Sequence, residues 1–218
     1  IIWKPSPHAN QCAKGIKKAW DKVSGDFADL ILVLEGGNEE AVLICKDKRI
    51  ALVSATGSTQ MGKELAPMVS ARLGKLLLEL GGNNAAIVCP SADLDLTIKG
   101  IAFSACGTTG QRCTSLRRLF VHEDIYDDCV KRLRNCFDDL IIGCPTKEGS
   151  QIGPLISEES YNRMQEILDS LKSKGVDVIG GERINIEDPK EFYVKPALVL
   201  VDAIEDEMLK ETFAPILY

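Results

Sequence analysis

The stretch Gly107-Thr-Thr-Gly-Gln-Arg-Cys-Thr-Ser115 organises this chain. Helical spacing over residues 93–106 leads into it, and the apolar run of residues 116–122 that follows predicts a strand. The stretch therefore predicts a glycine-punctuated loop that joins a helix to a strand and carries the thiol of Cys113. A loop thiol can be exposed and activated, and the neighbouring Arg112 favours the nucleophilic thiolate. The alternative is that Cys113, one of eight cysteines, is simply buried, as free cysteines commonly are.

Strands and helices alternate from this stretch towards both ends of the chain. Apolar runs predict strands at residues 1–3, 28–34, 49–54, 75–79, 85–89, 176–179 and 193–200. Helical spacing predicts helices at residues 8–23, 39–45, 58–73, 125–140 and 157–174, and residues 184–191 form a polar connection. Over residues 1–80 the near-continuous apolar strands indicate an α/β fold in which a parallel sheet is covered on both faces. We expect one α/β part in residues 1–82 and a second α/β domain in residues 83–218.

Composition narrows the classes of function. The net charge of −6 and the pI near 5.1 argue against nucleic-acid and acidic-membrane partners. The sequence has no apolar run of the roughly 18–20 residues that a membrane span needs, and its first residues do not show the charged-then-apolar pattern of a secretory leader. The cysteines lie inside periodic segments, which predicts reduced thiols in a cytoplasmic setting, with Cys129 and Cys136 on the core side of one helix. No C-x-x-C occurs and the two histidines lack ligand spacing, so we expect no metal site. Both ends look like cuts through a larger protein.

A glycine turn, Thr56-Gly-Ser-Thr-Gln-Met-Gly62, follows a predicted strand and opens a helix. Gly57 allows close approach of the backbone, and a helix N-terminus offers free N–H groups to an anion such as a phosphate. The spacing is not G-x-G-x-x-G, so the usual dinucleotide fingerprint is absent. The alternative is an ordinary strand–helix turn that is capped by Ser58 or Thr59.

Two acids also lie at places where chemistry is plausible. Glu79 ends an apolar strand before two glycines, where partial desolvation would raise its carboxyl pKa into the range of a general base. The alternative is a strand-end carboxylate that pairs with Lys or Arg. In Glu211-Thr-Phe-Ala-Pro215 the carboxylate could bind ribose hydroxyls and Phe213 could pack against a flat ring, or the segment is only a loop anchor.

The order and spacing of these motifs resemble the aldehyde dehydrogenase superfamily. Lys4-Pro-Ser6 is similar to its ribose-binding lysine segment, Leu78-Glu-Leu-Gly-Gly82 to its general-base motif and Gly110-Gln-Arg-Cys113 to its nucleophile motif. A finer likeness to the α-aminoadipic semialdehyde dehydrogenase (antiquitin-like) branch lies in residues 79–85, 110–114, 117–120 and 211–217. The resemblance implies the aldehyde dehydrogenase fold, truncated at both ends. Residues 1–82 would be the second half of a Rossmann-like NAD-binding domain, and residues 83–218 the cysteine-bearing catalytic domain.

The resemblance also implies a reaction, namely NAD-dependent oxidation of an aldehyde that carries a carboxylate to the corresponding acid. Cys113 would attack the aldehyde carbon to give a thiohemiacetal and then a thioester, and Glu79 would activate the water that releases the acid. Arg112 would bind the distal carboxylate of the substrate, because a guanidinium suits a planar carboxylate.

For the cofactor, the resemblance implies that NAD is held by Lys4 at the adenosine ribose, by Gly57, Ser58 and Gly62 along the pyrophosphate, and by Glu211 and Phe213 at the nicotinamide ribose. The choice between NAD and NADP stays open. Members of this family are commonly dimers or tetramers, so the resemblance implies a homo-oligomer. The expected location is the cytoplasm, or the mitochondrial matrix if an upstream transit segment exists.

Three departures from the family pattern keep other readings open. The asparagine of the family's oxyanion hole belongs upstream of Ile1, Ala55 replaces the usual Phe before Thr-Gly-Ser, and residues 26–29 replace a Pro-Gly. One alternative is therefore a catalytically inactive fragment or binding remnant of the same fold. Another is a thiol-dependent acyl transferase or esterase, which would use Cys113 and Glu79 but not Lys4 or the Gly57 turn.

Overall fold

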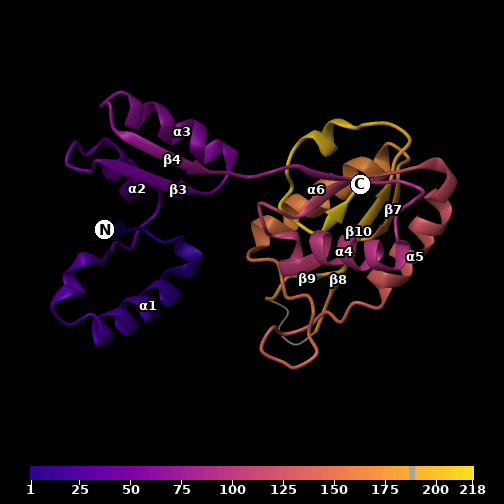
Figure 1. Ribbon diagram of the computed structural model, residues 1–218, viewed down its shortest axis with the longest axis horizontal. Helices are drawn as coiled ribbons and strands as arrows, with labels where there is room; N and C mark the ends of the chain where they lie inside the picture. The colour runs from indigo at the N-terminus through magenta and orange to yellow at the C-terminus, as the bar shows by residue number, and fades with distance from the viewer. Residues whose placement is uncertain (187–189) are drawn as a thin grey trace. The chain divides into compact units, whose positions relative to one another are not determined.

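The computed structural model describes residues 1–186 and 190–218. The chain forms two compact units, Ile1–Leu80 and Gly81–Tyr218, and each is described by itself (Figure 1). The polar connection expected at residues 184–191 lies partly outside the described residues.

The first unit alternates short strands with helices, as the sequence predicts. Its elements are β1 (Ile2–Trp3), η1 (Pro7–Ala9), α1 (Asn10–Val23), η2 (Gly25–Leu30), β2 (Leu32–Val33), α2 (Asn38–Lys46), β3 (Leu52–Thr56), α3 (Thr59–Ser70) and β4 (Lys75–Glu79), where η marks a 3-10 helix. Both strand pairs, β1 with β2 and β3 with β4, are parallel. The carboxyl ends of paired strands therefore lie at the same edge, where ligands bind in sheets of this kind.

The core of the first unit lies between α2, α3 and one face of the β3–β4 pair. Its buried side chains are Cys45, Val53, Leu65 and Val69. The expectation of one sheet covered on both faces is wrong for this unit. The strands form two separate two-stranded ladders, and the other face of β3–β4 exposes about half of Leu52 and Leu77.

The strand predicted at residues 28–34 is also shorter than expected, since only Leu32–Val33 is extended. Residues 25–30 form a 3-10 helix instead. The chain turns directly after α1 at Gly25, which has a φ of +53°, and the Trp20 indole donates to the Ala28 carbonyl at 3.2 Å. Because this carbonyl bonds to a side chain, it does not join a sheet ladder.

The second unit is a larger α/β domain. Its elements are β5 (Asn84–Val88), α4 (Leu94–Cys106), η3 (Gly107–Gly110), β6 (Leu116–Val121), η4 (Glu123–Ile125), α5 (Tyr126–Asp138), α6 (Glu158–Ser173), β7 (Asp177–Gly180), β8 (Arg183–Ile184), β9 (Tyr193–Val194), β10 (Ala197–Leu200), η5 (Asp206–Leu209) and β11 (Ile216–Leu217). β5 pairs with β6 and β10 with β11 in parallel, whereas β7 is antiparallel to β10 and β8 to β9. Backbone bonds from Tyr218 to Arg117 and from Leu119 to Tyr218 bring β6 beside the end of β11.

Helices cover both faces of the sheet in the second unit (Figure 1). Leu198 and Leu217 pack into the core formed with α4 and α5, whereas Val199 and Ile216 pack into the core formed with α6. Successive side chains of a strand point to opposite faces, so β10 and β11 each contribute side chains to both cores. Cys129 of α5 is fully buried, as predicted, and Cys136 is half-buried.

The strand predicted at residues 193–200 is interrupted. Pro196 separates β9 from β10, because proline has no N–H to donate to a ladder. In the part of the chain that the structure describes, no helix is long and apolar enough to cross a membrane.

Candidate functional site

The loop before β6 begins with a left-handed turn. Thr108, Thr109 and Gly110 have φ values of +54°, +57° and +63°, a conformation that is costly for threonine. Neighbouring segments compensate for this cost. The Thr109 hydroxyl donates to the Gly153 carbonyl at 2.8 Å, and the Gln111 amide oxygen accepts from Ile156 N–H at 2.9 Å. The turn is therefore anchored on residues 153–156.

Cys113 lies on this anchored loop and is exposed, as the sequence predicts. The Asn84 side-chain amide donates to the carbonyls of Cys113 and Ser115 at 2.8 and 2.9 Å. Gly82 lies against the same carbonyl, because a Cβ on Gly82 would come within 2.7 Å of the Cys113 oxygen. The alternative that Cys113 is buried is wrong. The thiol stands outside the core while its own backbone is fixed.

Other cysteines have the opposite character. Burial raises the pKa of the Cys45, Cys106 and Cys129 thiols above the ordinary value. A raised pKa keeps a thiol protonated and unreactive at neutral pH. Exposure on a held loop therefore distinguishes Cys113 from these three.

Arg112 is exposed beside the nucleophile candidate. Its Nε donates to the Thr108 hydroxyl at 2.8 Å, and its guanidinium lies over the ring of Phe103 of α4, 5.4 Å from the centroid. Both contacts orient a cation at the rim of the Cys113 loop.

Glu211 and Phe213 approach the same loop from the far end of the chain. One carboxylate oxygen of Glu211 lies 3.4 Å from Nη2 of Arg117. The other fits against Gly81, where any Cβ would overlap it. Phe213 has a φ of +55°, and the Arg117 guanidinium lies 5.7 Å from its ring centroid. Within the second unit the structure therefore brings Glu211 and Phe213 beside the Cys113 loop.

In the first unit the glycine turn lies at the carboxyl end of β3. Ser58 caps α3, since its hydroxyl accepts from the Met61 N–H at 3.1 Å, which is the capping role that the sequence left open. A Cβ on Gly57 would lie 2.7 Å from the Met61 sulfur. A Cβ on Gly62 would lie 2.6 Å from Leu80. Gly57 and Ser58 are exposed, whereas Gly62 is buried in the helix behind them.

Lys4 lies at the carboxyl end of the other strand pair. It follows β1, and its ammonium donates to the carbonyls of Pro5 and Gly36, both at 3.1 Å. The side chain is half-buried. It is thus folded against the ends of β1 and β2.

Glu79 is the last residue of β4, and the Gly57 N–H donates to its carbonyl at 3.0 Å. The expected partial desolvation is not found, because Glu79 is exposed on the β3–β4 face that no helix of its unit covers. Among the described residues no Lys or Arg forms an ion pair with Glu79, so the pairing alternative finds no support either.

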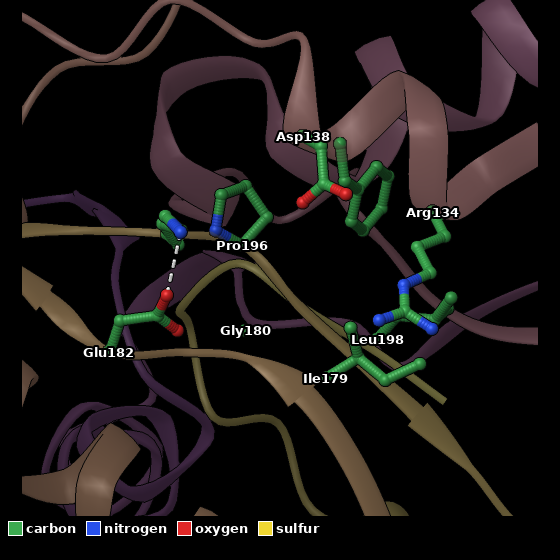
Figure 2. Close-up of a pocket in the computed structure, with 9 residues that line it drawn as sticks. Arg134, Asp138, Ile179, Gly180, Glu182, Pro196 and Leu198 are labelled. Carbon is green, nitrogen blue, oxygen red and sulfur yellow. Dashed lines mark ion pairs between the residues drawn. The ribbon is translucent and has the colours of Figure 1, made fainter.

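A separate hollow lies in the second unit between α5, β7 and β10. It has a volume of about 240 Å³, Lys195 and Glu182 pair at 2.8 Å on its wall, and Arg134 and Asp138 also line it (Figure 2). The paired ammonium lowers the pKa of the Glu182 carboxyl. None of the predicted site residues lines this hollow. Across residues 1–186 and 190–218, no three His, Cys, Asp or Glu side chains are grouped so that they could hold a metal ion.

Two residues that sequence reasoning did not select prove central to the loop, namely Asn84 and Arg117. Asn84 holds two carbonyls of the loop, and the buried Arg117 contacts both the loop and Glu211. The sequence signal that could have identified them is a polar residue in the first positions of a strand, since Asn84 begins β5 and Arg117 is second in β6. Periodicity alone assigns such a residue to the strand and gives it no partner.

The fold and the loop together define a thiol-bearing α/β protein, and comparison with known families makes this specific. Residues 1–218 match the aldehyde dehydrogenase family, and the chain belongs to that family. Among curated proteins it is similar to α-aminoadipic semialdehyde dehydrogenase of Rattus norvegicus, at 39% identity over 100% of this chain and 41% of the relative. It is also similar to aldehyde dehydrogenase family 7 member B4 of Arabidopsis thaliana, at 40% identity over 100% of this chain and 43% of the relative.

Solved structures share the fold. An NAD-dependent aldehyde dehydrogenase from Sinorhizobium meliloti matches with a TM-score of 0.89 and 27% identity, over 99% of this chain and 43% of that one. Betaine aldehyde dehydrogenase from Staphylococcus aureus, solved in complex with NAD⁺, matches with a TM-score of 0.92 and 23% identity, over 99% of this chain and 43% of that one. The fold expected from sequence is therefore confirmed. The chain spans about two fifths of the length of the curated relatives it matches.

Proposed function

We propose that the complete protein oxidises an aldehyde to the carboxylic acid with NAD⁺ as the electron acceptor. The observation that carries this proposal is the exposed Cys113 on a loop whose backbone is fixed by Asn84 and by residues 153–156, in a chain of the aldehyde dehydrogenase family. A fixed backbone with an exposed thiol suits covalent catalysis, since the nucleophile is aimed before substrate arrives.

In the proposed reaction the Cys113 thiolate adds to the aldehyde carbon. A C–S bond forms and the carbonyl π pair moves to oxygen, which gives a thiohemiacetal on Cys113. Bound NAD⁺ supplies the acceptor for the hydride that this carbon loses, and a thioester remains on Cys113. Glu79 takes a proton from water, the resulting hydroxide attacks the thioester, and the C–S bond breaks to release the acid and the thiolate.

We assign the dinucleotide to residues of both units. Lys4 serves the adenosine ribose, Gly57, Ser58 and Gly62 the pyrophosphate, and Glu211 with Phe213 the nicotinamide ribose. The turn fits a phosphate group, because it opens a helix of 12 residues at the carboxyl end of β3 and has exposed backbone at Gly57 and Ser58. Ala55 provides no aromatic wall for the adenine, so we expect the phosphates and riboses to dominate affinity.

The substrate proposed is an aldehyde that also carries a carboxylate. Arg112 is the residue assigned to that carboxylate, and its contacts with Thr108 and Phe103 keep the guanidinium beside the Cys113 loop. The similarity to α-aminoadipic semialdehyde dehydrogenase supports the same class of substrate.

We further propose that residues 1–82 are the second half of an NAD-binding domain and residues 83–218 belong to the catalytic domain. The compact units Ile1–Leu80 and Gly81–Tyr218 support a boundary close to this position. We also propose a homo-oligomer, either dimer or tetramer, and a cytoplasmic or mitochondrial-matrix location. The net charge of −6 supports the absence of nucleic-acid partners.

The test uses the complete protein with NAD⁺ and a semialdehyde, that is, a carboxylic acid with an aldehyde at its other end, and follows the absorbance of NADH. We expect NADH to form with the unaltered protein and to disappear in Cys113→Ala, with Cys12→Ala, another exposed cysteine, as the matched control that keeps activity. An acyl adduct on Cys113 without NADH would support an acyl transferase or esterase instead. If the protein forms no NADH and shows no NAD⁺-dependent thermal shift, the result would support the catalytically inactive remnant instead.

A further inference from the structure

Arg117 is a buried arginine of the second unit to which the proposed mechanism assigns no role. It is the second residue of β6, and only 2% of its side chain is exposed. Burying a guanidinium is costly unless hydrogen bonds and an opposite charge compensate. Such a group needs partners on several sides, and these partners indicate its role.

The partners of Arg117 belong to two segments that are distant in sequence. Its Nη1 donates to the Ala214 carbonyl at 2.9 Å, and its Nη2 donates to the Arg112 carbonyl at 3.2 Å. The same Nη2 lies 3.4 Å from a carboxylate oxygen of Glu211. One planar group therefore bonds both to the residue before Cys113 and to the segment that carries Glu211.

The two segments already touch at Gly110. A Cβ on Gly110 would lie 2.5 Å from the carbonyl carbon of Ala214, so the backbones are in direct contact there. Among the described residues, Arg117 is the one side chain that donates hydrogen bonds to both. Burial lowers the pKa of its guanidinium, while the Glu211 carboxylate opposes this shift and favours the charged form.

The ion pair with Glu211 is long for a charge-assisted bond, which is typically 2.7–2.9 Å. A contact of this length orients the carboxylate and leaves its oxygens able to accept further hydrogen bonds, such as those of two hydroxyls. The Phe213 ring below the guanidinium completes the arrangement.

We propose that Arg117 is a positioning residue that holds the Cys113 loop and the Glu211 carboxylate in fixed positions relative to each other. The distance between the nucleophilic thiol and the bound nicotinamide ribose is thereby fixed. This inference rests on the proposed function for the role of Glu211. Arg117 acts through these two groups and does not itself contact substrate.

The first experiment compares Arg117→Met and Arg117→Lys with the unaltered complete protein by steady-state kinetics and NAD⁺ binding. Losing a hydrogen bond to a charged group predicts a rise of about tenfold or more in KM and Kd for NAD⁺ in Arg117→Met. Arg117→Lys keeps the positive charge but loses the planar pair of donor nitrogens, so its KM and Kd for NAD⁺ should lie between those of the unaltered protein and Arg117→Met. If Arg117 acts through Glu211, adding Arg117→Met to Glu211→Gln should raise the KM for NAD⁺ by less than about twofold.

The control is Arg183→Met. Arg183 also stacks on aromatic rings in this unit, 5.5 Å from the Tyr161 centroid and 4.9 Å from that of Phe192. It should lower Tm without changing the KM for NAD⁺. If both Arg117 variants fold and leave KM and Kd for NAD⁺ within about twofold of the unaltered protein, the proposal is overturned.

A second readout does not depend on the reaction. Hydrogen exchange of the complete protein without ligand should be faster in residues 108–115 and 211–215 of both Arg117 variants and unchanged there in Arg183→Met. If the unaltered protein neither binds NAD⁺ nor forms NADH, the proposed function fails and this readout alone decides whether Arg117 joins the segments. Unchanged exchange in either segment contradicts the coupling.

Discussion

At the scale of single residues, the environment of each thiol decides its chemistry. Cys113 and Cys129 are both free cysteines, but one is exposed on a loop and the other lies fully buried in α5. Burial raises the pKa of the Cys129 thiol, and Asp128 adds to this shift. A nucleophile needs the thiolate, so only the loop position is suited to the proposed reaction.

Asn84 supplies a prediction at this scale. Its amide donates to two loop carbonyls, so Asn84→Ala should leave both without their partner and lower the free energy of unfolding by about 1–3 kcal/mol. Because the loop loses its fixed geometry, we also expect slower acylation of Cys113. Chemical denaturation and single-turnover NADH formation measure the two effects.

The control for this prediction is Asn162→Ala on the exposed side of α6. It should change neither quantity. An Asn84→Ala protein with unaltered stability and unaltered single-turnover rate would show that the two hydrogen bonds do not position the loop.

At the scale of elements, the Cys113 loop depends on Gly110, a position with no room for a side chain. Gly110 has a φ of +63° and its Cα faces the Ala214–Pro215 backbone, where a Cβ would lie within 2.5 Å. Gly110→Ala therefore combines backbone strain with a clash against main chain, and should lower the free energy of unfolding by about 2–5 kcal/mol. Gly149→Ala is the matched control, since it has a φ of +85° but open space around it.

The difference between these two variants isolates the contact between the Cys113 loop and the Ala214 segment. We expect Gly149→Ala to lower the free energy of unfolding by only about 1–2 kcal/mol, which is the cost of the left-handed backbone conformation for alanine. Equal losses in the two variants, measured by urea denaturation, would contradict the close packing of the loop on residues 214–215.

Elements with clear periodicity could be predicted from sequence, and elements held by distant partners could not. The predicted strand at residues 75–79 matches β4, and Asp93 and Ser157 cap α4 and α6 where their helical patterns begin. The strand expected at residues 28–34 shortened because the chain turns at Gly25 and a Trp20 bond holds Ala28. Local pattern has no information about such tertiary bonds.

The same limit applies to the site. The position of Cys113 on a loop between α4 and β6 could be predicted, because helix, glycine turn and strand follow one another in the sequence. The roles of Asn84 and Arg117 could not, since all their hydrogen-bond partners except the Arg112 carbonyl lie 29 to 97 residues away. The desolvation expected at Glu79 was wrong, because burial of a strand end depends on what covers its face, and that face is open within the first unit.

At the scale of the whole molecule, the two units carry different parts of the proposed chemistry. The first holds Lys4, the Gly57 turn and Glu79, and the second holds Cys113 and Glu211. The chain belongs to the aldehyde dehydrogenase family and covers about two fifths of the length of its curated relatives, and our proposal assigns all of these residues to one enzyme. The central claim is therefore that Cys113 forms the thioester and Glu79 resolves it.

One measurement tests this claim most directly, namely mass spectrometry of the Cys113 peptide after the complete Glu79→Gln protein has reacted with NAD⁺ and aldehyde. A glutamine cannot take the proton of water, so the account predicts a burst of about one NADH per active site, loss of steady turnover and an acyl adduct on Cys113. Unchanged steady turnover, or a burst with no adduct on Cys113, would contradict it.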